Sequence, residues 1–140
     1  MNWAERFSPY LARLVLLFAC ALFTELGVRS VFFPAYAAAR NQMVLQAPFA
    51  VTAQQVGFGA FPLAAAILLV ICLIRRETLV AGLTMVAVFV LTALLVRLYA
   101  ISAHGIAPQD MRPLVAESIL SLVSFSALYL EKQSTRLTAR

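Results

Sequence analysis

Residues 78–101 read TLVAGLTMVAVFVLTALLVRLYAI, and Arg97 is the only charged side chain in this stretch. About 20 helical residues cross the hydrocarbon core of a bilayer, so the run is long enough to span it. The run lacks the strict alternation of a barrel strand, and a helix satisfies all of its backbone hydrogen bonds within lipid. We therefore predict a transmembrane helix over residues 78–101.

Three further apolar runs of the same kind lie at residues 10–33, 51–74 and 113–130. The first is longer than the apolar core of a signal peptide and carries Glu25 and Arg29, so we expect it to be a retained span. A connection of a few residues at 75–77 makes the second and third spans antiparallel neighbours. The sequence thus predicts an all-α membrane protein: a single domain over residues 1–140, built as an antiparallel bundle of four transmembrane helices.

The composition agrees with a lipid-facing surface. The hydrophobic fraction is 63% and the mean hydropathy is +0.91, whereas a soluble domain is about 45–50% apolar. The formal net charge of +5 comes from scattered basic residues with no basic stripe, so we expect no nucleic-acid partner. Cys20 and Cys72 lie singly in apolar runs, and with one histidine in the chain we expect neither a metal site nor a cofactor.

The connections between the spans also carry predictions. The stretch from Ala35 to Ala50 is the longest, and its start favours a short interfacial helix that we expect Pro48 to end. Gly105 and Pro108 are expected to break the third helix. Pro62 is expected to kink the second.

Lysine and arginine counts predict the orientation, because basic residues are enriched on the cytoplasmic side. Seven residues fall on the side of the two termini and the 75–77 turn: Arg6, Arg13, Arg75, Arg76, Lys132, Arg136 and Arg140. Four fall on or toward the other side: Arg29, Arg40, Arg97 and Arg112. We therefore expect both termini in the cytoplasm.

Polar residues inside the spans gather toward their outer ends in this orientation, and the inner halves are expected to be almost purely apolar. The residues of this outer layer are Glu25, Arg29, Gln54, Gln55, Arg97 and Glu117, with His104 seven residues beyond Arg97. Glu25 and Arg29 have the spacing of a helix-surface ion pair. Arg97 and Glu117 are expected at matching depth on consecutive antiparallel helices, where they can pair.

Two interpretations of this layer stay open. One is structural, with ion pairs and amides that set the helix register and arginines that reach the headgroups. The other is a polar pocket in the outer leaflet that binds a small molecule, a lipid headgroup or a quinone-like ring. Catalysis is not expected, because the sequence has no metalloprotease-type histidine pair, no serine–histidine–aspartate set and no phosphate-binding glycine loop.

The second span carries a surface of small residues that permit close helix approach, and Ala60 and Ala64 have the small-x-x-x-small spacing. Its members are Gly57, Gly59, Ala60, Pro62 and Ala64. This surface is either an internal packing face or a contact with another subunit or a second copy.

Several short segments, taken in order, resemble the domain of unknown function 4345 family of small bacterial four-helix membrane proteins. The segments are Arg40-Asn41, residues 55–59 (QVGFG), Arg97-Leu98-Tyr99 with Gly105, and Glu117. The resemblance covers roughly residues 11–130. It implies a four-helix bundle with an arginine and a glutamate near one end, and it implies no reaction. Glu25 and Arg29 depart from the family pattern.

These observations favour an accessory or scaffold subunit of a larger membrane complex, in the bacterial inner membrane, with membrane lipids and other subunits or a homo-oligomer as partners. The alternative is a membrane protein that binds a small molecule or lipid in the outer layer. A small intramembrane enzyme or transporter is a third hypothesis, and the apolar inner halves of the spans oppose a continuous transport path unless a homo-oligomer forms it.

Overall fold

In a computed structural model, the backbone is described for residues 3–40, 42–106 and 108–138, and side chains for the same residues except 3–8, 109 and 134–138. Asn41 and Arg140, and the side chains of Arg6 and Arg136, which the predictions above used, lie outside the described residues. Within that part of the chain the secondary structure is entirely helical. The all-α prediction is confirmed.

Four helical stretches among the described residues are long and apolar enough to cross a membrane. They are Pro9–Phe32, Pro48–Ile74, Arg76–His104 and Met111–Gln133. Each overlaps one of the predicted runs. The chain therefore has the helices of a multi-pass membrane protein. It divides into two compact units, which are described separately: unit 1 is Met1–Leu16 with Arg75–Arg140, and unit 2 is Leu17–Ile74.

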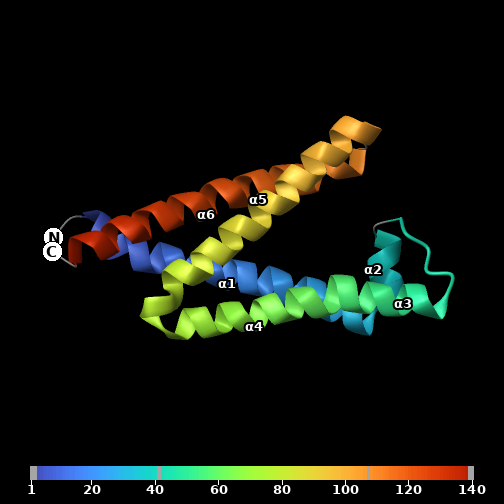
Figure 1. Ribbon diagram of the computed structural model, residues 1–140, viewed down its shortest axis with the longest axis horizontal. Coiled ribbons are helices and arrows are strands. Elements are labelled where there is room, and N and C mark those ends of the chain that lie inside the picture. The colour runs from blue at the N-terminus through green and yellow to red at the C-terminus, as the bar shows by residue number, and fades with distance from the viewer. Residues whose placement is uncertain (1–2, 41, 107, 139–140) are drawn as a thin grey trace. The chain divides into compact units, whose positions relative to one another are not determined.

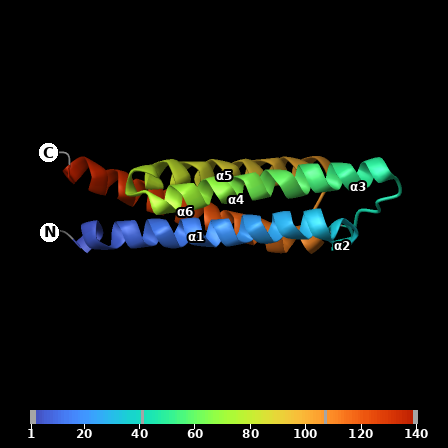
Figure 2. The ribbon, with the colours of Figure 1, turned by 90° about the horizontal axis from the view of Figure 1, so that it is seen from below.

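Unit 2 contains the C-terminal part of α1 (Trp3–Phe32), α2 (Pro34–Arg40), α3 (Pro48–Gln55), the π-helical turn η1 (Val56–Ala60) and α4 (Phe61–Ile74). Figures 1 and 2 show that α1 lies alongside the continuous α3–η1–α4 helix in this unit. The two helices approach closely at Gly59, where an added Cβ would come within 2.6 Å of the Val31 Cγ2 atom. Small residues permit this approach, as they do at many helix contacts in membranes.

Pro48 begins a helix, and the expectation that it would end one is wrong. The predicted short helix after the first span is α2, which ends at Arg40, and Pro48 is the first residue of α3 after the cap residue Ala47. Proline suits the first helical position, because the missing N–H would have no partner there and its φ angle is already helical.

The expected disturbance at Pro62 takes the form of a π-helical turn, η1, directly before α4. Pro62 has no N–H to donate to the carbonyl of Phe58 one turn earlier, and its ring crowds that carbonyl. A widened turn relieves this conflict while the helix continues, and such single turns are the usual form of π-helix.

Unit 1 contains the start of α1, the short helix η2 (Arg76–Thr78), α5 (Leu79–His104), the short helix η3 (Pro108–Asp110) and α6 (Met111–Thr138). As predicted, α5 ends at Gly105, which adopts a φ of 84° and donates its N–H to the Ile101 carbonyl at 2.9 Å. Glycine is favoured at such a helix end because it lacks a Cβ. After the turn, α6 returns antiparallel to α5 and packs against it.

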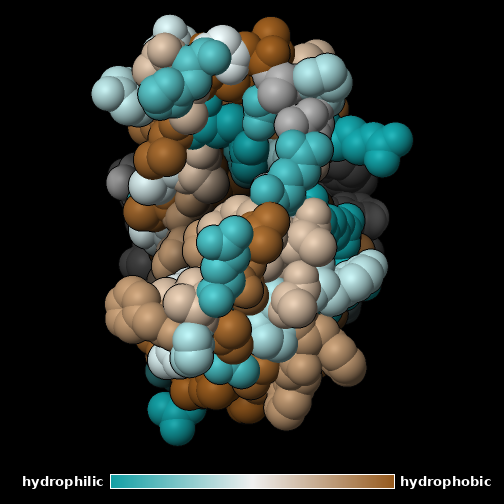
Figure 3. Space-filling model, turned by 90° about the vertical axis from the view of Figure 1, so that its right-hand side faces the viewer, coloured by the Kyte–Doolittle hydropathy of each residue, from teal (hydrophilic) through white to brown (hydrophobic). Residues whose placement is uncertain are grey.

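Large apolar side chains are exposed along every membrane-length helix, among them Leu17 on α1, Ile67 on α4, Phe89 on α5 and Leu122 on α6. Figure 3 shows apolar and polar residues intermixed on the end face of the molecule. So much exposed apolar side-chain surface is unusual for a soluble monomer and is what lipid covers in a membrane protein.

Helix α6 carries buried polar side chains that were not among the predicted site residues. The predicted apolar run ends at Leu130, but α6 continues to Thr138, and Glu131 is only 4% exposed. Ser121 and Ser124 are also buried on this helix, and their hydroxyl oxygens have no hydrogen-bond partner. Glu117, Ser124 and Glu131 are seven residues apart, so they share one face of α6.

Candidate functional site

The strongest polar contact described in unit 1 joins α5 and α6. Arg97 donates from Nε to Glu117 Oε2 and from Nη2 to Glu117 Oε1, both at 2.8 Å. The side chain of Arg97 is 28% exposed and that of Glu117 is 19% exposed. This two-pronged geometry is the strong form of an arginine–carboxylate contact. Arg97 and Glu117 therefore pair between two consecutive antiparallel helices, as expected.

Asp110 completes the cluster, and it was not among the predicted site residues. Its Oδ1 atom lies 3.6 Å from Arg97 Nη1, and its side chain is 28% exposed. Asp110 ends η3, directly before α6 and six residues after His104 in the sequence. The sequence feature that could have identified Asp110 is an acidic residue in the short connection that follows a span with an arginine. Nothing in the sequence fixed the direction of its side chain.

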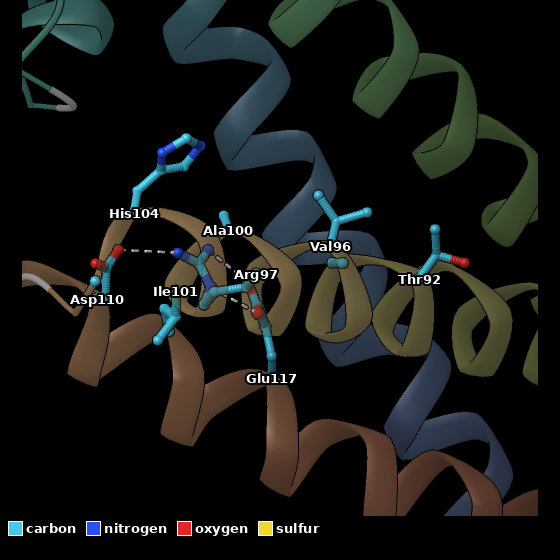
Figure 4. Close-up of a pocket in the computed structure, with 10 residues that line it drawn as sticks. Thr92, Val96, Arg97, Ala100, Ile101, His104, Asp110 and Glu117 are labelled. Atoms are coloured by element: carbon cyan, nitrogen blue, oxygen red, sulfur yellow. Dashed lines mark hydrogen bonds and ion pairs between the residues drawn. The ribbon is translucent and has the colours of Figure 1, made fainter.

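The Arg97 cluster (Arg97, Asp110 and Glu117) faces an open groove of about 670 Å³. All of its lining residues belong to unit 1, and they are Thr92, Ala93, Val96, Arg97, Ala100, Ile101, His104, Gly105, Asp110 and Glu117. The α5 residues recur at three- and four-residue spacing, which puts them on one helix face. Figure 4 shows the Arg97 guanidinium between the Asp110 and Glu117 carboxylates, with His104 at the end of α5.

A second open groove, of about 390 Å³, continues from the first along α5. Its lining residues are Val88, Phe89, Thr92 and Ala93, and the last two also line the first groove. Together the grooves follow α5 from Val88 to Gly105. The walls are mainly apolar, and the charged groups gather at the end nearest the α5–α6 turn.

The predicted polar residues of unit 2 make local contacts. Arg29 Nη2 lies 2.7 Å from Glu25 Oε1 on the same helix, and both side chains are substantially exposed. Gln55 donates from Nε2 to the Val31 carbonyl at 2.9 Å, which ties the start of the second span to α1. Gln54 is 3% exposed, and its Oε1 atom has no hydrogen-bond partner. All four residues belong to unit 2.

The small residues of the second span do not share one environment. Gly59 is buried and packs against α1, which fits the internal-packing interpretation. Ala60 and Ala64 are exposed, and Pro62 is half-buried. Gly57 is exposed, and an added Cβ there would meet nothing within 4 Å. The spacing predicted a single surface, but the structure divides it between an inner and an outer face.

The Arg97 cluster brings one guanidinium and two carboxylates together at the α5–α6 contact. Among the described residues, no three histidine, cysteine, aspartate or glutamate side chains come together to hold a metal ion. The guanidinium and two carboxylates supply fixed donors and acceptors at one end of an apolar groove. Apolar walls with a few convergent polar groups are typical of small-molecule sites.

Comparisons with protein-family models, with curated proteins and with solved structures give no match to this chain. The resemblance to the domain of unknown function 4345 family therefore stays a prediction that rests on the quoted segments.

Proposed function

We propose that this chain is a multi-pass membrane protein that binds a small amphipathic molecule in the α5 groove. The observation that supports the proposal is the position of the Arg97 cluster at one end of a groove whose apolar walls continue along α5. A ligand with a polar head and an apolar tail matches both parts. Lipids and quinone-like molecules have this form.

The proposed setting is the bacterial inner membrane, with both termini in the cytoplasm. The excess of lysine and arginine at the termini and at the 75–77 turn supports this orientation. The resemblance to a family of bacterial membrane proteins supports the location. In this orientation the α5–α6 turn faces outward, so the Arg97 cluster lies in the outer leaflet and an amphiphile would enter from there.

The test uses photoreactive alkyl amphiphiles with one chain length and different head groups, added to the full chain in phosphatidylcholine nanodiscs. Labelled peptides are mapped by mass spectrometry, and the exposed α4 segment around Ile67 serves as the internal reference for lipid contact. We expect at least one probe to label residues 92–104 well above that reference. Equal labelling of both segments by every probe would count against the proposal.

A matched pair of variants separates binding in the groove from general contact with lipid. Ala93 lines both grooves, whereas Ala81 is exposed on the same helix outside them. Ala93→Phe fills the groove, so it should lower the labelling several-fold. Ala81→Phe adds the same side chain elsewhere and should leave the labelling unchanged. Equal effects of the two variants would contradict a specific site.

A second candidate function is that of an accessory subunit in a larger membrane complex. The observation that favours it is the exposed surface of Gly57, Ala60 and Ala64 on the second span, beside Phe61, which is 68% exposed. Small residues on an outer helix face suit close contact with another transmembrane helix. Purification in mild detergent tests it, because a monodisperse species with the 15.3 kDa mass of one chain and no co-purifying protein would contradict it.

A further inference from the structure

Two buried serine hydroxyls on α6 have no described hydrogen-bond partner. Ser121 is 6% exposed and Ser124 is fully buried, and the Oγ atom of each lacks a partner in the part of the chain that the structure describes. A hydroxyl that leaves water without gaining a partner costs more free energy than one hydrogen bond contributes. Two such groups within one turn of the same helix therefore call for a partner.

Two other serines on α6 satisfy their hydroxyls within the helix. Ser118 donates from Oγ to the Leu114 carbonyl at 2.8 Å, and Ser126 donates from Oγ to the Leu122 carbonyl at 2.7 Å. Both bonds run four residues back along the chain, which is a common way for serine to satisfy its hydroxyl inside a helix. The two buried serines do not make this bond, which leaves their hydroxyls available to another partner.

The neighbouring helix carries apolar side chains at the level of these serines. The two serines follow Glu117 by four and seven residues, so they continue the face of α6 that meets Arg97. Because α5 and α6 are antiparallel, the same steps taken back along α5 from Arg97 lead to Ala93 and Val90. Neither of these side chains can form a hydrogen bond, so α5 supplies no side-chain partner at these two positions.

The spacing of the two serines suits a single bridging molecule. Side chains three residues apart on a helix have Cβ atoms about 5–6 Å apart, and an O–H···O hydrogen bond spans about 2.8 Å. One oxygen atom placed between the two hydroxyls can therefore bond both of them. Water supplies such an atom, it donates and accepts as each hydroxyl does, and serine and alanine are among the smallest side chains that could surround it.

We infer that one buried water molecule binds between Ser121 and Ser124 of α6 and is held by both hydroxyls. The inference is independent of the amphiphile proposed for the α5 groove, because neither serine is among the residues that line it. Glu117 lies one turn before Ser121, so the water extends the polar groups of the Arg97 cluster by about 10 Å along α6. This part of the α5–α6 contact is therefore hydrated.

The experiment is water-edited solid-state NMR of the full chain in phosphatidylcholine bilayers, with isotope-labelled serine and alanine. It measures how quickly magnetisation passes from water protons to the Cβ atoms of individual side chains. Ala127 is the internal reference, because it is fully buried on the same helix and has no hydroxyl. The signals of Ser121 and Ser124 should build up several-fold faster than that of Ala127. Build-up as slow as that of Ala127 would overturn the inference.

Ser124→Ala tests whether the two hydroxyls hold the same water. It removes one of the two hydroxyls, so the build-up at Ser121 should slow several-fold. Ser126→Ala is the matched control, because it removes a serine hydroxyl of the same helix that is bonded to the Leu122 carbonyl. It should leave the build-up at Ser121 unchanged. If Ser124→Ala also leaves it unchanged, no shared water is bound and the inference is wrong.

The unfolding equilibrium in dodecyl sulfate mixed micelles gives a second readout. A hydroxyl that holds the water contributes a hydrogen bond, so Ser121→Ala and Ser124→Ala should each raise the unfolding constant about fivefold. Because the water is shared, the double variant should raise it by less than the product of the two single effects. A hydroxyl without a partner gives the opposite sign, since alanine then removes a buried polar group without loss. Single variants that lower the constant or leave it unchanged would contradict the water site.

Discussion

An arginine–glutamate pair is described in each of the two units, and the two pairs differ in what they connect. In unit 2, Glu25 and Arg29 are neighbours on one helix and are substantially exposed. In unit 1, Arg97 and Glu117 come from two helices, and Glu117 is 19% exposed. A pair within a helix adds a little local stability, whereas a pair between helices also sets how the two helices align.

The helix contacts of the two units differ in the same way. The contact in unit 2 is a close apolar approach at Gly59, reinforced by the hydrogen bond from Gln55 to the Val31 carbonyl. The α5–α6 contact in unit 1 includes a charged link beside an open groove. Close packing leaves no room for a ligand, and the groove next to the charged link does. This difference explains why the candidate site lies in unit 1.

The largest expected effect tests the close approach in unit 2. Gly59→Val places a branched side chain against Val31, where even a Cβ would come within 2.6 Å of Cγ2 and 3.3 Å of the backbone nitrogen. Because a backbone atom cannot move aside cheaply, we expect the free energy of unfolding to fall by about 3 kcal/mol. Unfolding is followed by circular dichroism as the fraction of dodecyl sulfate in mixed micelles is raised.

Gly57→Ala is the control for this prediction, because a Cβ at Gly57 meets nothing within 4 Å. Its effect should stay within about 0.5 kcal/mol, as for most exposed substitutions. If Gly59→Val is as mild as Gly57→Ala, α1 and the second span do not pack in the described way.

The next largest effect tests the link in unit 1. Arg97→Ala leaves the Glu117 carboxylate with its main partner removed, and we expect a loss of about 2 kcal/mol, less than for a fully buried pair because both groups retain some exposure. A double-mutant cycle with Glu117→Ala should give a coupling energy of about 1.5 kcal/mol between the two side chains. Additive single-variant effects would mean that the pair does not form.

The smallest effect belongs to the pair in unit 2. The same cycle on Glu25→Ala and Arg29→Ala should give a coupling energy of about 0.3 kcal/mol, the usual size for an exposed pair on one helix. A coupling energy as large as that of Arg97 and Glu117 would place the Glu25–Arg29 pair in the hydrocarbon region. It would also remove the contrast between the two units.

Some features of the fold and site were predictable because they depend on residues that are close in the sequence. A run such as residues 78–101 must be helical in lipid, whatever packs against it. The Glu25–Arg29 pair follows from a spacing of four residues. The pairing of Arg97 with Glu117 could also be predicted. A short turn aligns two antiparallel helices, so it determines which residues of the two helices lie side by side.

Other features could not be predicted, because they depend on the direction of a face or of a connection. The spacing of small residues in the second span says that they can pack, and it does not say that Gly59 points inward while Ala60 and Ala64 point outward. Asp110 lies in a connection where no helical period applies. The continuation of α6 to Thr138 lies beyond the predicted run at 113–130, because the apolar pattern ends at Leu130 while the helix does not.

By itself, the sequence determined four membrane-length helices, the break at Gly105 and the local ion pair on α1, since hydrocarbon length, backbone satisfaction and helical spacing act on neighbouring residues. Only the tertiary structure decided that Asp110 joins Arg97 and Glu117, and that an apolar groove leads away from them along α5. Both depend on how α5 and α6 pack after the turn, because packing determines which side chains meet and where space remains between them.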